Sequence, residues 1–346
     1  MRTLNLKEKV CFACLNDSNL FLSYILSKTA YENNYKILIL SDHYGKETYS
    51  RIIRDCSIWD EVVLINEAGR NPEDIARQLK QMDFSNIDVL HYFAFAQKSY
   101  TSILFDYIPK DTRIILTVYC IVTYYFKEYY LNYIKNINSV NIDLNRVSEV
   151  WVYDERLYTG ELLKGPVKSM DIFEYLNNEE LLSGFCNELN AIFGYTHRLM
   201  DYDVMFFDQS ITSRFINADK EKRLFSTVLN AFDNRKVVVK LHPNTHSVWK
   251  YNDFKVSIIN EKRLPWEVIL INELKYNKSN LKNKIFATYF SESLFTTRIF
   301  LKNLNLSCKT IWLRDVLQKN TKTYLGIKED SEIFFFKQKT AYEMLM

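Results

Sequence analysis

The stretch VVVKLHPNTH, Val237–His246, shows how this chain is built. Its three leading valines form a short apolar run, which is typical of a buried strand in a parallel sheet. Pro243 cannot donate a backbone hydrogen bond, so the strand must end there. Lys240 and His242 are two residues apart and are expected on one face at its carboxyl end. Ligands of open α/β sheets bind at that edge, and a cation beside an imidazole suits phosphate. The alternative is a strand that merely ends in a polar turn.

Length and composition predict two domains of ordinary size without a nucleic-acid partner. The chain has 346 residues, of which 47% are hydrophobic, so it can bury two cores. Its net charge is only +3, and no long basic block is present. Nucleic-acid binding would need a concentrated basic surface, so this composition argues against it.

The cysteines and the apolar runs predict a cytoplasmic protein. Cys11 and Cys14 form a C-x-x-C inside an apolar segment, with no second pair and no nearby histidine. We interpret them as reduced core residues, not as a zinc or redox site. No signal peptide and no run long enough to span a membrane is visible in the sequence. The aromatic content of 15% also fits peripheral contact with the inner membrane.

Apolar runs and helical patterns alternate along the whole chain, which predicts βαβ units and parallel sheets. In the first half, strands are expected at Val10–Leu15, Lys36–Leu40, Glu61–Ile65, Ile87–Phe95, Arg113–Tyr119 and Val147–Tyr153. In the second half they are expected at Asp203–Phe207, Arg235–Leu241, Phe254–Ile259, Lys284–Phe290 and Thr310–Leu313. A mostly helical stretch, Met170–Phe193, carries the chain between the halves. We therefore expect two doubly wound, Rossmann-like domains, at 1–195 and 196–333.

Glycine usage narrows the class of α/β protein. The chain has only seven glycines and no G-x-G-x-x-G, which disfavours a dinucleotide oxidoreductase and a P-loop protein. Two doubly wound domains facing across a cleft, the glycosyltransferase B (GT-B) arrangement, fit better. The last residues, Phe334–Met346 or FFFKQKTAYEMLM, resemble a mistranslated sequencing-adapter tail of metagenomic proteins. We interpret residues 334–346 as non-native; the alternative is a genuine amphipathic end.

Three strand ends of the second half carry polar residues suited to a nucleotide: Lys240–Pro243, Pro265–Glu267 and Ser291–Ser293. Hydroxyls and free backbone N–H groups at a helix N-terminus bind phosphate well. The Glu267 carboxylate can accept both hydroxyls of a ribose, or an amino group of a base. Taken singly, Glu267 could simply cap its helix and Ser291 could be an N-cap only. Their occurrence at successive strand ends favours a nucleotide site.

These motifs resemble bacterial sialyltransferases of the GT-B type, in particular glycosyltransferase family 52 and the capsular polysialyltransferases. The family's His-Pro motif corresponds to Lys240–Pro243 and its serine motif to Phe290–Ser293. The segment Leu264–Glu267 resembles the Pro-aromatic-Glu stretch between them. Met205–Gln209 looks like the strand that opens the second domain, and Gln209 is included among the expected nucleotide contacts. The acidic pair of the family's first domain resembles Asp154 and Glu155, although Arg156 stands where the family often has glycine.

The resemblance implies an inverting, metal-independent transfer of sialic acid from CMP-sialic acid, with no cofactor. Asp154 or Glu155 would take the proton of the acceptor hydroxyl. Lys240, His242, Ser291 and Ser293 would stabilise the departing phosphate, with Pro243 and Glu267 completing the nucleotide site. The acceptor implied is a lipooligosaccharide or capsular glycan.

Two other functions fit the same motifs. A CDP-glycerol glycerophosphotransferase or a Kdo transferase would share the His-Pro and serine features. A non-catalytic assembly protein of a surface-glycan locus could keep the fold without the reaction. Two further histidines have simpler interpretations: His91 lies inside an apolar strand and is expected in the core, and His246 is expected in a surface turn.

Overall fold

The computed structural model describes residues 7–42, 45–93, 99–118, 144–158, 165–198, 200–209, 218–245, 248–289 and 291–313. The chain divides into two compact units, Met1–Thr196 and His197–Met346. The sequence-based boundary stood at 195/196. The expected non-native tail, 334–346, and His246 lie outside the described residues.

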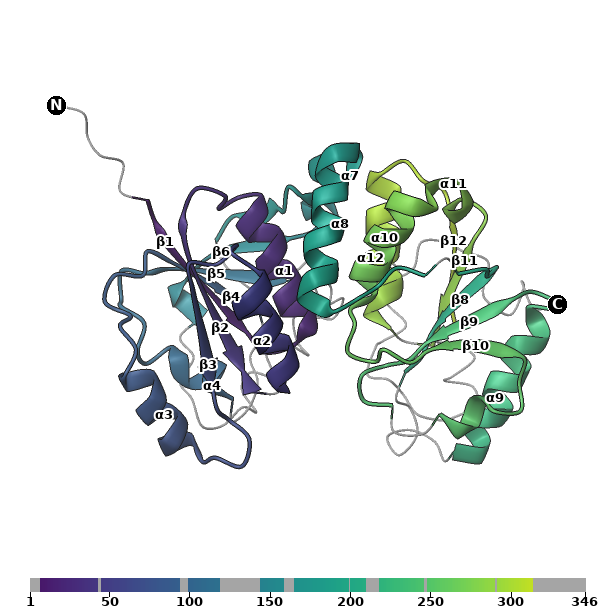
Figure 1. Cartoon of the computed structure of the whole chain (residues 1–346), viewed down its shortest axis with the longest axis horizontal. Helices are drawn as coiled ribbons and strands as arrows, with labels where there is room; N and C mark the ends of the chain where they lie inside the picture. The colour runs from purple at the N-terminus through teal and green to yellow at the C-terminus, as the bar shows by residue number, and fades with distance from the viewer. Residues whose placement is uncertain are drawn as a thin grey trace. The chain divides into compact units, whose positions relative to one another are not determined.

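The first unit is built on a seven-stranded parallel sheet with the order β3-β2-β1-β4-β5-β6-β7 (Figure 1). The strands are β1 (Lys9–Cys14), β2 (Tyr35–Ser41), β3 (Glu61–Ile65), β4 (Val89–Tyr92), β5 (Arg113–Val118), β6 (Val147–Val152) and β7 (Val167–Ser169). The order reverses between β1 and β4, which creates a switch point where neighbouring connections diverge. The short edge strand β7 was not predicted, because its three residues show no apolar run.

Several helices of the first unit begin at a residue whose side chain caps them. They are α1 (Asp17–Lys28), α2 (Gly45–Asp55), α3 (Pro72–Lys80), α4 (Tyr100–Leu104), α7 (Ile172–Asn177) and α8 (Glu179–Phe193), with short 3-10 turns at Leu144–Arg146 and Glu155–Leu157. The Asn16 side chain accepts the amide of Asn19 at 3.0 Å and so starts α1. The predicted helical stretch Met170–Phe193 is two helices, because Asn178 caps a new one by accepting two amides of the first turn.

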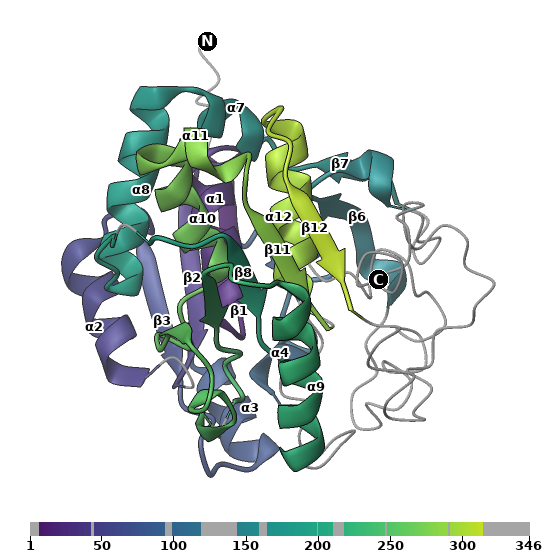
Figure 2. The same ribbon diagram turned by 90° about the vertical axis from the view of Figure 1, so that its right-hand side faces the viewer.

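The second unit repeats the same topology with five parallel strands in the order β10-β9-β8-β11-β12. They are β8 (Val204–Phe207), β9 (Val237–Lys240), β10 (Val256–Ile259), β11 (Ile285–Thr288) and β12 (Lys309–Trp312). Figure 2 shows β11 and β12 side by side, and the register pairs Ile285 with Lys309. The switch point lies between β8 and β11, so the carboxyl ends of these two strands flank the expected ligand edge.

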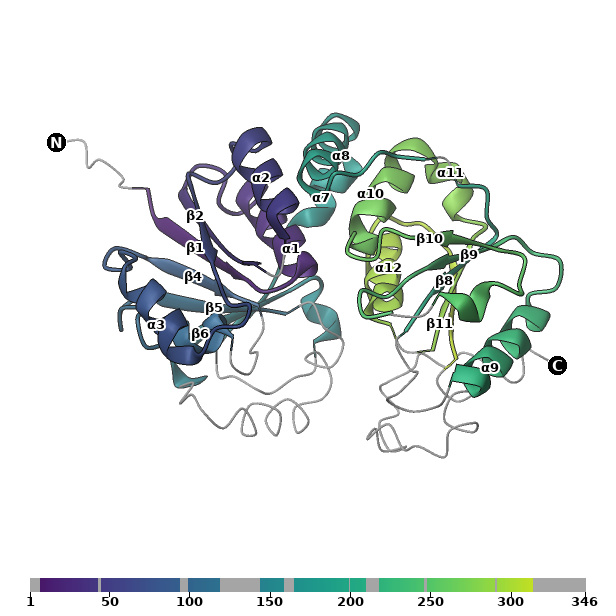
Figure 3. The same cartoon turned by 60° about the horizontal axis from the view of Figure 1, so that its bottom comes forward.

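Helices cover both faces of the second sheet (Figures 1 and 3). They are α9 (Ala218–Ala231), α10 (Trp266–Tyr276), α11 (Lys278–Leu281) and α12 (Glu292–Asn303), and a 3-10 turn spans Trp249–Tyr251. Successive strand residues face opposite sides: Phe206 meets Phe225 of α9 with ring centroids 5.2 Å apart, and Phe207 meets Trp266 of α10 at 4.9 Å. Burying each such aromatic side chain stabilises the fold by about 1.5–3 kcal/mol.

Both units are Rossmann-like, as predicted. Cys11 and Cys14 are buried free thiols, as predicted, and burial raises the pKa of both. Within the described ranges no helix combines the length and apolar character that a membrane crossing needs.

Candidate functional site

The carboxyl edge of the second sheet gathers polar residues from several elements. Asp208 and Gln209 directly follow β8, and Ser291 follows β11, so they flank the switch point. His242 comes two residues after β9, the neighbour of β8. Because parallel strands end at one edge, a single topology brings these groups from distant sequence positions to the same side of the sheet.

The His-Pro segment forms a closed turn. The amide of Thr245 donates to the carbonyl of His242 at 2.9 Å. The amide of Asn244 donates to Nδ1 of His242 at 3.1 Å, so in the neutral imidazole the proton lies on Nε2. Pro243 is exposed at the bend. The turn therefore holds the half-buried His242 ring in one orientation and one tautomer.

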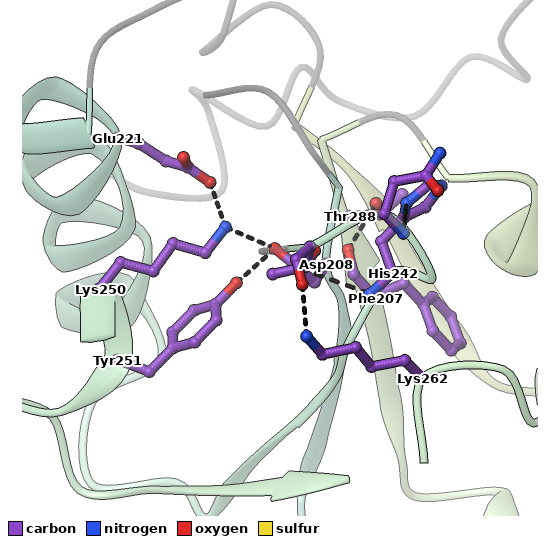
Figure 4. Close-up of polar contacts among 10 residues, drawn as sticks. Phe207, Asp208, Glu221, His242, Lys250, Tyr251, Lys262 and Thr288 are labelled. Carbon is purple, nitrogen blue, oxygen red and sulfur yellow. Dashed lines mark hydrogen bonds and ion pairs between the residues drawn. The ribbon is translucent and has the colours of Figure 1, made fainter. Parts of the chain in front are cut away.

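Asp208 is the centre of a buried polar network beneath this turn (Figure 4). It accepts hydrogen bonds from the Thr245 and Tyr251 hydroxyls and from Lys250 Nζ at 2.9 Å. Lys250 also pairs with Glu221 of α9. The three charged residues Asp208, Lys250 and Glu221 are only 3%, 4% and 2% exposed, so the single positive charge of Lys250 offsets the two buried carboxylates in part, with little help from water.

Lys240 has a different place from the one the sequence predicted. Its ammonium donates to the backbone carbonyls of Leu241, Glu261 and Lys262, at 3.1, 3.0 and 3.3 Å. An ammonium has three N–H donors, and three carbonyls already use them. Lys240 therefore fastens the loop between β10 and α10, and it does not present its donors to a ligand as an anion clamp would.

Glu267 lies in the first turn of α10, whose N-cap residue Pro265 offers no capping side chain. Its carboxyl is buried, and burial raises its pKa above the ordinary value. Its own backbone amide and Thr296 of α12 hydrogen-bond to the carboxylate and oppose that shift, as does the positive charge of Lys240. The neighbouring Trp266 Nε1 donates to Thr297 at 2.7 Å, which ties α10 to α12.

Ser291 caps α12, as one of the two sequence interpretations held. Its Oγ accepts the amide of Ser293 at 3.4 Å. Ser293 is half-buried, and its carbonyl accepts the Thr297 hydroxyl at 2.5 Å. The start of a twelve-residue helix thus lies beside the end of β11, and a phosphate there would meet a positive dipole end.

The acidic pair of the first unit splits into two environments. Asp154 is buried, and its two oxygens accept Nε and a terminal nitrogen of Arg156, each at 2.7 Å. It also caps the 3-10 turn by accepting the Arg156 amide. Glu155 is exposed, and its amide donates to the Ser169 hydroxyl. Arg156, where the family often has glycine, therefore holds one of the two candidate bases.

Sequence reasoning did not single out Asp208, Thr245, Lys250 or Tyr251. Asp208 was visible only as the polar residue after an apolar strand, which is common. Lys250 lies 42 residues further on, and no spacing rule joins the two. Among the described residues, no group of three or more His, Cys, Asp or Glu side chains could hold a metal ion. His91 is buried in the core, as predicted.

The chain is similar in fold to solved nucleotide-sugar enzymes. One is MnaA from S. aureus in complex with UDP (TM-score 0.53, 9% identity, 89% of this chain and 79% of that one). Another is UDP-GlcNAc 2-epimerase from Methanocaldococcus jannaschii (TM-score 0.50, 12% identity, 94% and 95% covered). The GT-B domain of a Photobacterium damselae sialyltransferase also aligns (TM-score 0.45, 11% identity, 84% and 88% covered), but too weakly to support an argument. No protein-family model and no curated protein matches the sequence. The first two similarities show a GT-B glycosyltransferase-like fold, which confirms the predicted fold class.

Proposed function

We propose that this chain is a glycosyltransferase whose second domain binds a nucleotide-sugar donor at the carboxyl edge between β8 and β11. The observation that carries the proposal is the convergence of an oriented imidazole, a buried carboxyl and a helix N-terminus on that edge. They belong to His242, Glu267 and Ser291. Imidazole and helix N-terminus suit phosphate, and a carboxylate suits ribose hydroxyls.

The donor we favour is CMP-sialic acid, with a lipooligosaccharide or capsular glycan as acceptor. The support is the order of the His-Pro, Pro-Trp-Glu and Ser-x-Ser segments in the sequence. In such a transfer the glycosidic bond to phosphate breaks, a bond to the acceptor oxygen forms, and the acceptor proton passes to a base. Donors near the departing phosphate stabilise its charge. In this scheme His242 donates from Nε2, and Ser291 and Ser293 with the first amides of α12 complete the anion site.

The proposed base is Glu155 or Asp154, and the contacts favour Glu155. A base must offer a lone pair to the acceptor hydroxyl. Both Asp154 oxygens already accept guanidinium donors, whereas Glu155 is exposed. We expect Glu155→Gln to lower kcat by about 10²–10⁴-fold. We expect Asp154→Asn to lower stability more than kcat, because it removes the carboxylate that pairs with Arg156 and caps the 3-10 turn. Full transfer activity in the double variant Asp154→Asn, Glu155→Gln would exclude both carboxylates as the catalytic base.

Nucleotide binding is the first test. Isothermal titration with CMP, CDP and UDP should show binding by the wild-type chain. His242→Ala removes the imidazole contact to phosphate and should weaken binding by at least about tenfold, which corresponds to about 1.4 kcal/mol. Lys309→Ala is a matched control, because Lys309 is an exposed cation of the same domain at the amino end of β12. If none of the nucleotides binds, or if both variants bind equally well, the site is wrongly placed.

A donor panel tests the finer assignment. CMP-sialic acid, CMP-Kdo, CDP-glycerol and UDP-GlcNAc are each incubated with a mixed glycan acceptor, and ³¹P NMR follows nucleotide release. Release of CMP from CMP-sialic acid alone, with a sialylated product by mass spectrometry, is the expected result. Release from another donor moves the assignment to that transferase class. Binding without turnover of any donor favours the non-catalytic assembly role.

A second candidate is a nucleotide-sugar epimerase, because one fold neighbour is bound to UDP and another is a UDP-GlcNAc 2-epimerase. Epimerisation inverts one carbon of the donor sugar and needs no acceptor. UDP-GlcNAc incubated with the chain alone, read by ¹H NMR, separates this activity from transfer. Appearance of the C2 epimer without UDP release would replace the transferase proposal.

A further inference from the structure

The polar network around Asp208 contains more contacts than the end of a strand usually has. Asp208 follows β8, and four donors converge on its carboxylate from one loop. Two of them, the His242 amide at 3.5 Å and the Thr245 hydroxyl, bond to the same oxygen, Oδ2. These two donors belong to the first and last residues of the His-Pro turn. Asp208 thus forms hydrogen bonds to both ends of the turn (Figure 4).

The other oxygen of Asp208 anchors the segment that follows. Oδ1 accepts Lys250 Nζ at 2.9 Å and the Tyr251 hydroxyl. Lys250 reaches on to Glu221, so the same carboxylate is connected to α9. Burial raises the pKa of Tyr251, and the Asp208 charge and hydrogen bond raise it further, so the hydroxyl stays protonated as a donor. The Asp208 side chain therefore contacts both described parts of this loop, the turn at His242–Thr245 and the segment at Lys250–Tyr251.

Buried ion pairs are weak sources of stability, because desolvation offsets most of their attraction. A network of this kind is better explained by the geometry that it fixes. The Asp208 carboxylate accepts four protein donors and Asp208 is only 3% exposed, so we do not expect it to contact a ligand itself. What it controls is the turn that carries His242, whose Nδ1 is already fixed from the other side by the Asn244 amide.

We propose that Asp208 is a positioning residue that orients the His242 imidazole for the phosphate of a nucleotide donor. The proposal rests on the proposed function for its ligand, but its structural part stands without one. Preorganised donors are worth more than mobile ones, because the ligand does not have to order them on binding. Loss of the Asp208 charge should therefore loosen the ring first and weaken nucleotide binding as a consequence.

The test compares Asp208→Asn with Glu221→Gln. Each variant removes one buried carboxylate from the same ion network, but only Asp208 contacts the turn. Long-range ¹H–¹⁵N NMR of the ring nitrogens is read first without nucleotide. The chain has only five histidines, so the His242 signals can be assigned by comparison with His242→Ala. In Asp208→Asn the His242 ring should lose its fixed Nε2–H tautomer pattern and CMP or UDP binding should fall about tenfold or more. Glu221→Gln should destabilise the domain and leave the ring signals unchanged.

Thr245→Val provides a second variant if Asp208→Asn fails to fold. It removes one donor to Oδ2 while Asp208 keeps Lys250 and Tyr251, and we expect a smaller shift of the His242 signals in the same direction. An unchanged His242 ring in Asp208→Asn or Thr245→Val, or equal shifts in Asp208→Asn and Glu221→Gln, overturns the positioning role. If the wild-type chain binds no nucleotide but the His242 ring signals still shift in Asp208→Asn, the proposed function is wrong and the positioning role of Asp208 is retained.

Discussion

The two domains use the same strand order but bury different polar groups in their sheets. In the first, His91 of β4 is wholly buried between neutral partners: Thr117 Oγ1 and the Tyr31 hydroxyl each lie 2.8 Å from a ring nitrogen. In the second, Asp208 at the end of β8 is buried among charges. A neutral pair can lie deep in a strand at little electrostatic cost, whereas charges need partners from several elements. The charged cluster lies at the carboxyl edge of the sheet, where we propose that the ligand binds, whereas His91 lies within the core.

The largest effect is expected from breaking the charged cluster at Lys250. Lys250→Met leaves two buried carboxylates without their cation, which should lower the free energy of unfolding of the second domain by about 3–5 kcal/mol. Hydrogen exchange read by mass spectrometry should show lost protection in β8 and β9 peptides and unchanged protection in β1 and β4. The triple variant Asp208→Asn, Glu221→Gln, Lys250→Met should recover part of the loss. A change below about 1 kcal/mol would mean that the cluster is not electrostatically coupled.

The next effect concerns pH and His91. Burial lowers the pKa of His91 to about 3, with the Arg113 charge contributing. The folded domain keeps the ring neutral while the unfolded chain takes up a proton below about 6.5. Stability is therefore fully present above about pH 6.5 and falls, by up to about 1.4 kcal/mol per pH unit, as pH decreases toward 3.

Urea unfolding between pH 7 and 4.5, with hydrogen exchange of β4 peptides, measures this slope. His91→Gln should flatten the slope read from the β4 peptides. His197→Gln should leave that β4 slope unchanged, because His197 belongs to the second domain, although burial lowers the pKa of His197 as well. If the wild-type and His91→Gln slopes coincide, His91 is not the acid-sensitive group.

Helix caps give a smaller, matched pair across the two domains. Asn16→Ala and Ser291→Ala should each lower the free energy of unfolding by about 1 kcal/mol, because each removes the side-chain acceptor of an amide in the first turn. Only Ser291→Ala should also weaken nucleotide binding, measured by titration. Equal nucleotide affinities in the two variants would make Ser291 a cap and nothing more.

The smallest expected effect is a gain in stability, on replacing Glu267, whereas the variants above lose stability. Glu267 has a raised pKa from burial, so its carboxyl contributes most to stability when protonated and loses that contribution as pH rises through the raised value. Glu267→Gln should therefore raise Tm, more at pH 8 than at pH 5, while nucleotide binding weakens. Differential scanning calorimetry at the two pH values checks the sign. A lower Tm at both values would show that the charge is stabilised in place.

Local sequence patterns predicted the strands well where the apolar run had clear ends. Glu61–Ile65 matches β3 residue for residue, and the apolar run before Pro243 gave β9 with its end within one residue. Prediction failed where the signal was short or interrupted, as at β7 and at the break before α8. In the site, a polar turn after the strand and an N-cap at Ser291 were the alternatives to a phosphate site, and the structure contains both the turn and the cap. Phosphate binding by these residues stays a prediction.

What the sequence determined by itself is the alternation of strand and helix, and with it two parallel sheets and the edge on which His242, Glu267 and Ser291 must gather. Apolar periodicity and backbone capping act over a few residues, so they can be read locally. The direction of the Lys240 ammonium, the pairing of Asp154 with Arg156 in a fixed fork, and the convergence of Lys250 and Thr245 on Asp208 were decided only by the tertiary structure. A two-residue spacing fixes the face of a strand, but the partners of the side chains there come from loops 21 to 42 residues away.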